Sequence, residues 1–196
     1  MFDFLIKAYT FFSSRKFISF GQNSKIKPFL NSSHEEHIDI GDNVDIGSFC
    51  RIAVSTEFAG HKVRSKNNVR LKIGNHVDVG HNTFISANNN IQIGNHVIMS
   101  SYVFITDHDH GFTDVSKNLH KQPLTNGGHV IIGDNVFLGI KSSVLKNVTI
   151  GNHSVIGANS VVTKDIPPYT IATGNPAKVI KRYSPKAKKW VSLSSS

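Results

Sequence analysis

An aliphatic residue returns at every sixth position between Ile132 and Val162. The residues of this column are Ile132, Leu138, Val144, Ile150, Ile156 and Val162. Two companion columns keep the same period: glycines one position later (Gly133, Gly139, Gly151, Gly157) and modest side chains four positions later (Val136, Ser142, Val148, Ser154, Ser160). Helices repeat every 3.6 residues and half-buried strands every two, so this period fits neither. It predicts a parallel β-helix, a solenoid in which each six-residue segment builds one flat face of a coil.

The same repeat occurs earlier in the chain. The string I-G-[DN] opens five segments, at Ile40, Ile73, Ile93, Ile132 and Ile150. The aliphatic residue is expected to point inward and stack on its equivalent one coil away. The Gly and Asn or Asp that follow suit a corner, because they tolerate positive φ. Irregular antiparallel strands joined by glycine turns would not hold this phase over five segments.

Two long excursions interrupt the repeat, at about 53–72 and 106–129. Loops of this length in compact folds are usually functional or disordered. The first excursion is basic and includes His61, Lys62, Arg64, Lys66 and Arg70. The second opens with T-D-H-D-H-G-F at 106–112, the densest ionisable cluster of the chain. Histidine titrates near neutrality and is the commonest general base, so this cluster is the candidate catalytic site.

Composition indicates a single domain. The chain has 196 residues, 39% of them hydrophobic and 18% charged. The single cysteine, Cys50, excludes an internal disulfide framework and falls in the small inward column, which predicts a core position. The formal net charge is +9, with a basic cluster near the end of the chain. No recognised nucleic-acid module accompanies it, so we expect no nucleic-acid partner; a phosphorylated small molecule or an anionic lipid fits at least as well.

The first residues predict a short amphipathic helix. Apolar residues at helical spacing are Phe2, Leu5, Ile6, Tyr9 and Phe12. Packing on the open end of the coil is the favoured interpretation, and a membrane-surface role, suggested by Arg15 and Lys16, is the minority one. The segment is too short to span a bilayer and lacks the features of a secretory signal. We therefore expect a cytoplasmic protein, with peripheral contact at the inner membrane left open.

Three motifs carry a family resemblance: D-H-D-H-G-F at 107–112, V-V-T-K-D-I-P-P at 161–168 and G-N-P-A at 174–177. With the repeats, they resemble the hexapeptide-repeat acyltransferases, in the branch of maltose and galactoside acetyltransferases and surface-polysaccharide O-acetyltransferases. The resemblance covers roughly 38–181. It implies an all-β fold, a left-handed parallel β-helix assembled as a homotrimer; handedness rests on the resemblance, because crossovers are generally right-handed. We expect an N-terminal helix and cap at 1–30, the β-helix at 31–166 and a helical tail at 167–196.

The resemblance further implies an acetyl-CoA-dependent O-acetyltransferase without a permanently bound cofactor. The acceptor would be a sugar hydroxyl of a bacterial surface glycan, such as O-antigen, capsule or a precursor, and transfer would be direct. The site residues that the resemblance implies are His108 as general base with His110 as second candidate; Ser86, Asn88, Asp107 and Asp109 on the acceptor side; Gly139, Ile140, Ala158, Thr163, Lys164, Lys178 and Lys181 for CoA. For Asp107 and Asp109 the sequence leaves open whether they contact the sugar or orient the imidazole. Ser86 stands where simple-sugar relatives carry Asn, which disfavours a disaccharide acceptor. Lys178 replaces a frequent Arg, which disfavours bidentate phosphate contact.

Other functions remain as alternatives. Within the family these are sugar N-acetylation and xenobiotic acetylation. Zinc carbonic anhydrase-like proteins share the coil, and this chain has 11 histidines. Zinc needs three or four converging ligands, whereas His76, His96 and His153 are expected at solvent-facing corners, so we expect no metal site. A purely structural scaffold is disfavoured by the histidine loop.

Overall fold

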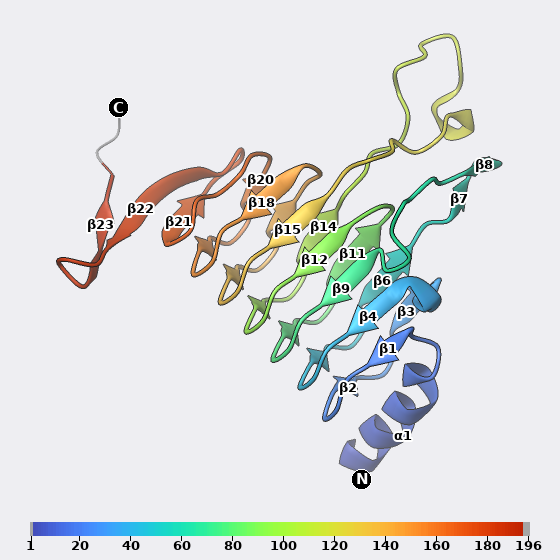
Figure 1. The fold of residues 1–196 in the computed structure, drawn as a ribbon, viewed down its shortest axis with the longest axis horizontal. Helices are drawn as coiled ribbons and strands as arrows, with labels where there is room; N and C mark the ends of the chain where they lie inside the picture. Colours follow the sequence, from blue (N-terminus) through green and yellow to red (C-terminus); the bar gives the residue numbers. More distant parts are fainter. Residues whose placement is uncertain (1, 194–196) are drawn as a thin grey trace.

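The computed structural model describes residues 2–193. Three parallel sheets form the faces of a prism around which the chain winds in successive coils (Figure 1). The first sheet, sheet A, contains β1 (Ser19–Phe20), β4 (Ile38–Ile40), β9 (Leu71–Ile73), β12 (Ile91–Ile93), β15 (Val130–Ile132) and β18 (Val148–Ile150). Sheet B contains β2 (Lys25–Ile26), β5 (Asp45–Ile46), β10 (Asp78–Val79), β13 (Ile98–Met99), β16 (Phe137–Leu138), β19 (Val155–Ile156), β21 (Thr170–Thr173), β22 (Lys178–Ser184) and β23 (Lys189–Ser192). Sheet C contains β3 (Asn31–Ser33), β6 (Arg51–Val54), β11 (Phe84–Ala87), β14 (Phe104–Thr106), β17 (Ser143–Val144) and β20 (Val161–Val162).

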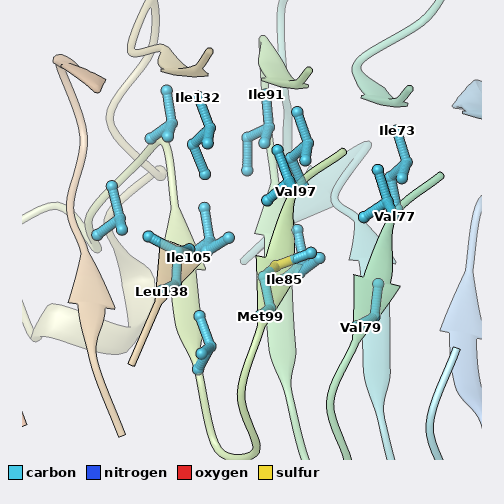
Figure 2. Packing of buried hydrophobic residues seen from close by; sticks show 14 of the residues in the cluster. Ile73, Val77, Val79, Ile85, Ile91, Val97, Met99, Ile105, Ile132 and Leu138 are labelled. Carbon is cyan, nitrogen blue, oxygen red and sulfur yellow. The ribbon is translucent and has the colours of Figure 1, made fainter. Parts of the chain in front are cut away.

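The sixfold columns form the core, as the sequence predicts. Every residue of the column from Ile132 to Val162 is at most 1% exposed, and the small column from Val136 to Ser160 is also buried. Equivalent residues stack from coil to coil; Val79, Met99 and Leu138 follow one another in β10, β13 and β16 (Figure 2). Cys50 lies in the core, and burial raises the pKa of its thiol.

The corner between sheets A and B repeats one hydrogen-bond pattern. The side-chain oxygen of Asn75 accepts the backbone N–H of Asp42, and that of Asn95 accepts the N–H of Asn75, at 2.8 and 2.9 Å. Asp134 and Asn152 continue the same ladder. The residue after each of these adopts positive φ; His76, His96 and His153 are among them and are exposed, as expected. The corner is therefore held by side chains that the repeat itself supplies.

Helix α1 (Phe2–Ser14) lies at the N-terminal end of the coil (Figure 1). Ile6 is buried, the Tyr9 hydroxyl accepts the N–H of Leu30 at 3.0 Å, and Thr10 Oγ1 accepts the N–H of Ile26 at 2.9 Å. The expected packing face is therefore only partly correct, because Leu5 and Phe12 point to solvent. In residues 2–193 no helix has the length and apolar character needed to cross a membrane.

The tail is not helical, which corrects the sequence prediction. Strand β22 pairs antiparallel with β21, and β23 pairs antiparallel with β22. Side chains of β22 alternate between exposed and half-buried from Lys178 to Tyr183, the period of a strand. Strand β22 forms because it can pair with the open edge of β21, and the sequence of the tail does not reveal that edge. The parallel ladder itself runs from β1 to β21, beyond the expected range 31–166 at both ends.

Both excursions leave the prism at the corner between sheets C and A. The first joins β6 to β9 and contains the hairpin β7 (Glu57–Phe58) and β8 (His61–Lys62). The second joins β14 to β15 and contains one short 3₁₀ helix, η2 (Leu119–Lys121). Their tips extend in the same direction from the coil (Figure 1). Between them, β11 and β12 are joined by the tight turn 88–90.

Candidate active site

The second excursion begins with a buried carboxylate. Asp107 is 0% exposed, and its two oxygens accept the backbone N–H groups of Asn88, Asn89 and Asn90 at 2.7–2.8 Å. A fourth hydrogen bond joins Oδ1 to Nδ1 of His108, at 2.9 Å. All four partners are N–H donors, an arrangement that the carboxylate form satisfies fully. Asp107 thus anchors the start of the loop to the tight turn of the preceding coil.

His108 is oriented by this carboxylate. Its side chain is only 9% exposed. Thr106 adds a second restraint, because its hydroxyl donates to the His108 carbonyl at 3.1 Å. Since the carboxylate accepts from Nδ1, the proton of the neutral ring resides on Nδ1 and Nε2 carries the lone pair. This tautomer is the one that a general base acting through Nε2 requires.

Arg70 lies next to the same turn. Its Nη1 donates to the carbonyls of Ser55 and Asn88 at 2.9 and 3.3 Å. Desolvation lowers the pKa of Arg70, and the charge of Asp107 opposes that shift. The guanidinium stays protonated in proteins, so a buried cation offsets the buried carboxylate. Arg70 closes the first excursion, and it therefore connects that excursion to the anchor of the second.

A second set of contacts closes the neck of the loop. Asp109 exchanges hydrogen bonds with Thr125: its N–H donates to Thr125 Oγ1 at 2.8 Å, and its carbonyl accepts the Thr125 N–H at 2.9 Å. The Asp109 carboxylate pairs with Lys146 Nζ at 2.6 Å. These contacts hold both arms of the loop beside the coil that follows. His108 therefore sits between two fixed residues.

His110 lies in a different environment. Its exposed ring packs edge-to-face on Phe58 of the first excursion, with ring centroids 4.8 Å apart. His61 Nε2 lies 3.3 Å from the carbonyl oxygen of Lys121, a second contact between the two excursions. Among the described residues His110 pairs with no carboxylate. His110 thus helps to join the excursions, whereas His108 has the orienting partner.

The predicted acceptor residues lie at the ends of the neighbouring strands β11 and β14 but differ in solvent exposure. Ser86 is half-buried, and its register partner in β14 is Thr106. Asn88 is 1% exposed and donates through Nδ2 to the Thr125 carbonyl at 3.1 Å. Within residues 2–193 its Oδ1 is buried without a hydrogen-bond partner. The four predicted acceptor positions, two in this coil and Asp107 and Asp109 in the next, therefore lie around His108.

The predicted CoA residues separate onto two edges of the prism. Gly139 and Ile140 form the corner between β16 and β17, and Ala158 lies at the same corner one coil later. A Cβ on Gly139 would lie 2.6 Å from the Ala158 nitrogen, so this close approach requires glycine. Thr163 and Lys164 follow β20 on the edge from which the second excursion departs.

Lys178 and Lys181 lie on β22, with Thr173 and Ile171 as their register partners in β21. They are therefore near the end of sheet B. In the part of the chain that the structure describes, no group of three or more His, Cys, Asp or Glu side chains is placed to hold a metal ion.

Comparisons with known proteins agree with this fold. A model of the family described as bacterial transferase hexapeptide (six repeats) matches residues 129–164. The putative lipopolysaccharide biosynthesis O-acetyl transferase WbbJ of Escherichia coli K12 is 36% identical over 167 residues, 78% of this chain and 76% of that protein. The chain belongs to the hexapeptide-repeat acyltransferases. It is an acyltransferase with the left-handed parallel β-helix of that family.

Solved structures share the fold. The N-acyltransferase AntD of Bacillus cereus, solved with dTDP and 3-hydroxybutyryl-CoA, superimposes with a TM-score of 0.74 at 21% identity, covering 93% of this chain and 92% of AntD. A maltose O-acetyltransferase of Clostridium difficile 630 gives a TM-score of 0.58 at 27% identity, covering 86% of this chain and 71% of that one. Members of the fold thus include enzymes named for oxygen and for nitrogen acceptors.

Sequence reasoning missed several parts of the site. The three N–H groups that hold Asp107 belong to the backbone of 88–90, and side-chain identity does not reveal them. Arg70 stood out only as one of several basic residues, and Lys146 not at all. One signal was available for the turn: three consecutive asparagines at the end of a coil indicate a tight corner.

Proposed function

We propose that this acyltransferase moves an acetyl group from acetyl-CoA to a sugar hydroxyl of a bacterial surface glycan or its precursor. The observation that carries the proposal is the oriented His108 ring, held through Nδ1 by a buried carboxylate with Nε2 left to act. The O-acetyl transferase of E. coli to which the chain is 36% identical supports the oxygen acceptor and the glycan.

In the proposed reaction, His108 Nε2 takes the proton of the acceptor hydroxyl as its oxygen attacks the thioester carbonyl. The C–O bond forms, the C–S bond breaks, and the imidazolium returns the proton to the departing thiolate of CoA. A positioned base contributes about 10²–10⁴-fold, and holding donor and acceptor together contributes further. Asp107 and Arg70 would act as positioning residues, because both are buried and neither reaches the reacting atoms.

For the acceptor, we assign direct contact first to Ser86 and Asp109. Asp107 has every oxygen engaged, so it orients the base in this mechanism. Within residues 2–193 the Oδ1 atom of Asn88 has no hydrogen-bond partner, but Asn88 is only 1% exposed. It can accept a hydrogen bond from a sugar hydroxyl only if the Asn88 side chain first moves away from the Thr125 carbonyl. The basic first excursion would form the opposite side of the acceptor site, because Phe58 and His61 contact the second excursion.

For the donor, we propose that the pantetheine arm follows the corner at Gly139, Ile140 and Ala158. Thr163, Lys164, Lys178 and Lys181 then serve the nucleotide end, where cations suit phosphate groups. Because these residues lie on separate edges of one prism, we propose that two subunits of a homotrimer contribute them jointly. Light scattering of the purified protein tests the trimer.

The test of the proposal is acetyl transfer by purified protein with acetyl-CoA, followed by thiol release. We expect His108→Ala to fold normally and to lose about 10²–10⁴-fold in turnover. The matched control is His110→Ala, which retains most activity because its ring packs on Phe58. Normal turnover in His108→Ala, with a dead His110→Ala, would reverse the assignment of the base. Acceptors that differ only in hydroxyl or amine at one carbon separate O-transfer from N-transfer.

A further inference from the structure

Helix α1 is apolar on two sides. One side carries Ile6 and Tyr9 against the first coil. At 3.6 residues per turn, Phe4, Phe11 and Phe12 project away from that side. They are 73%, 54% and 69% exposed, and Leu5 adds 53%. A surface helix normally turns one apolar stripe to the core and a polar face to water, so this second apolar face needs an occupant.

The surroundings of that face are cationic. Residues 1–25 contain four basic residues (Lys7, Arg15, Lys16 and Lys25) and one acid, Asp3. All four basic residues are exposed. The Arg15 guanidinium lies 4.1 Å from the centroid of the Phe11 ring, with its charge above the aromatic face. Aromatic side chains bordered by cations are typical of helices that lie in the interface of an anionic bilayer.

A hollow beside the helix combines the same two features. Its volume is about 410 Å³, and it lies between α1 and the first coil. Its apolar wall includes Phe11 and Phe20, and its rim carries Lys7 and Lys25. Two lysines above an apolar wall suit a phosphate headgroup with part of its acyl chain below. A second copy of the same basic face would instead meet like charges.

We propose that α1 docks this enzyme on an anionic lipid surface. The helix has 13 residues, too short to span a bilayer, so it lies parallel to the surface with Phe4 and Phe12 inserted. Lys7, Arg15, Lys16 and Lys25 face the headgroups. The inference is independent of the acceptor, since the residues concerned are at the N-terminal end of the coil and the histidine loop lies four coils away along the chain path (Figure 1).

Cosedimentation of the full chain with vesicles tests the proposal. We expect binding to vesicles of phosphatidylethanolamine and phosphatidylglycerol, and none to phosphatidylcholine alone. Binding should weaken between about 0.1 M and about 1 M salt as screening increases. Replacing Lys7 or Lys16 by Gln should cost about fivefold in partitioning for each charge.

The decisive pair exchanges two exposed phenylalanines at two places. Phe4→Asn with Phe12→Asn should reduce partitioning at least about tenfold. Phe112→Asn with Phe137→Asn is the matched control: these rings are 59% and 38% exposed and lie in the second excursion and in β16, several coils from α1. Thermal melts confirm that both variants fold. The proposal is wrong if the wild type ignores anionic vesicles or if both pairs lose binding equally. Dissociation of the oligomer in the α1 variant, without lipid binding by the wild type, would assign the face to a second copy.

Discussion

The corner between sheets A and B and the corner between sheets C and A differ in one instructive way. At the first, every coil repeats the same contact, as Asn75 does for Asp42 and Asn95 for Asn75. At the second, the successive connections 55–70, 88–90 and 107–129 differ in length and in contacts. The repeated contacts stack the three sheets of the coil, which we call the wall. The residues that orient His108, the proposed base, lie where repetition stops.

The largest expected effect is on the wall. Ile150→Ala removes a fully buried side chain from β18 and should cost about 2–5 kcal/mol of unfolding free energy. Its control, Ile98→Ala on the outer surface of β13, should cost less than about 0.5 kcal/mol because Ile98 is 49% exposed. Urea unfolding measures both. Turnover of the folded Ile150→Ala enzyme should be near normal, and a large loss of turnover there would break the division between wall and site.

The second expected effect is on the irregular corner. The Asp107→Asn variant replaces one accepting oxygen by an NH₂ group, which would face the N–H donors of 88–90 or of His108. The His108 ring would then lose the hydrogen bond that orients it. We expect turnover to fall by about 10–100-fold, with KM for acetyl-CoA little changed. Asp109→Asn makes the same exchange two residues away, where the side chain pairs with Lys146 and is proposed to contact the acceptor, so its loss should appear mainly in KM for the acceptor and less in turnover. Equal losses in the two variants would contradict the role of Asp107.

The smallest expected effect concerns the single thiol of the wall. Burial raises the folded pKa of Cys50 above its ordinary value of 9.0, so the unfolded chain ionises first as the pH rises. The stability contributed by the neutral thiol is complete below pH 9.0 and declines above it. Unfolding free energies of the wild type and of Cys50→Ala should therefore converge as the pH rises from 9.0. A constant difference between the two proteins would contradict the shift.

The wall was predictable because its signal is local. Ile132, Leu138 and Val144 each repeat six residues on, and each has the buried inward position that this period predicts. The tail was not predictable from its own residues: Val179 and Ile180 fit a helix or a strand until the open edge of β21 is known. In α1 the periodicity fixed the helix but not which apolar side packs, because both sides are apolar.

The site was half predictable. His108 stood out as a titratable residue at the exit of a coil, since its chemistry is in its own side chain. The role of Asp107 was not decidable, because its hydrogen-bond donors are backbone groups 17–19 residues earlier in the chain. Arg70 is more distant still along the chain and meets the site only through the stacking of coils.

Because both excursions leave the same edge of the coil, the first can be replaced while the second is kept. The hairpin of β7 and β8 returns to the coil at Leu71, and its length adds little to the entropy of closing the connection. A longer, shorter or differently charged hairpin can thus be grafted at this edge while the imidazole and its carboxylate stay in register. A lineage of such acyltransferases can change the acceptors it takes by exchanging the first excursion and keeping the second.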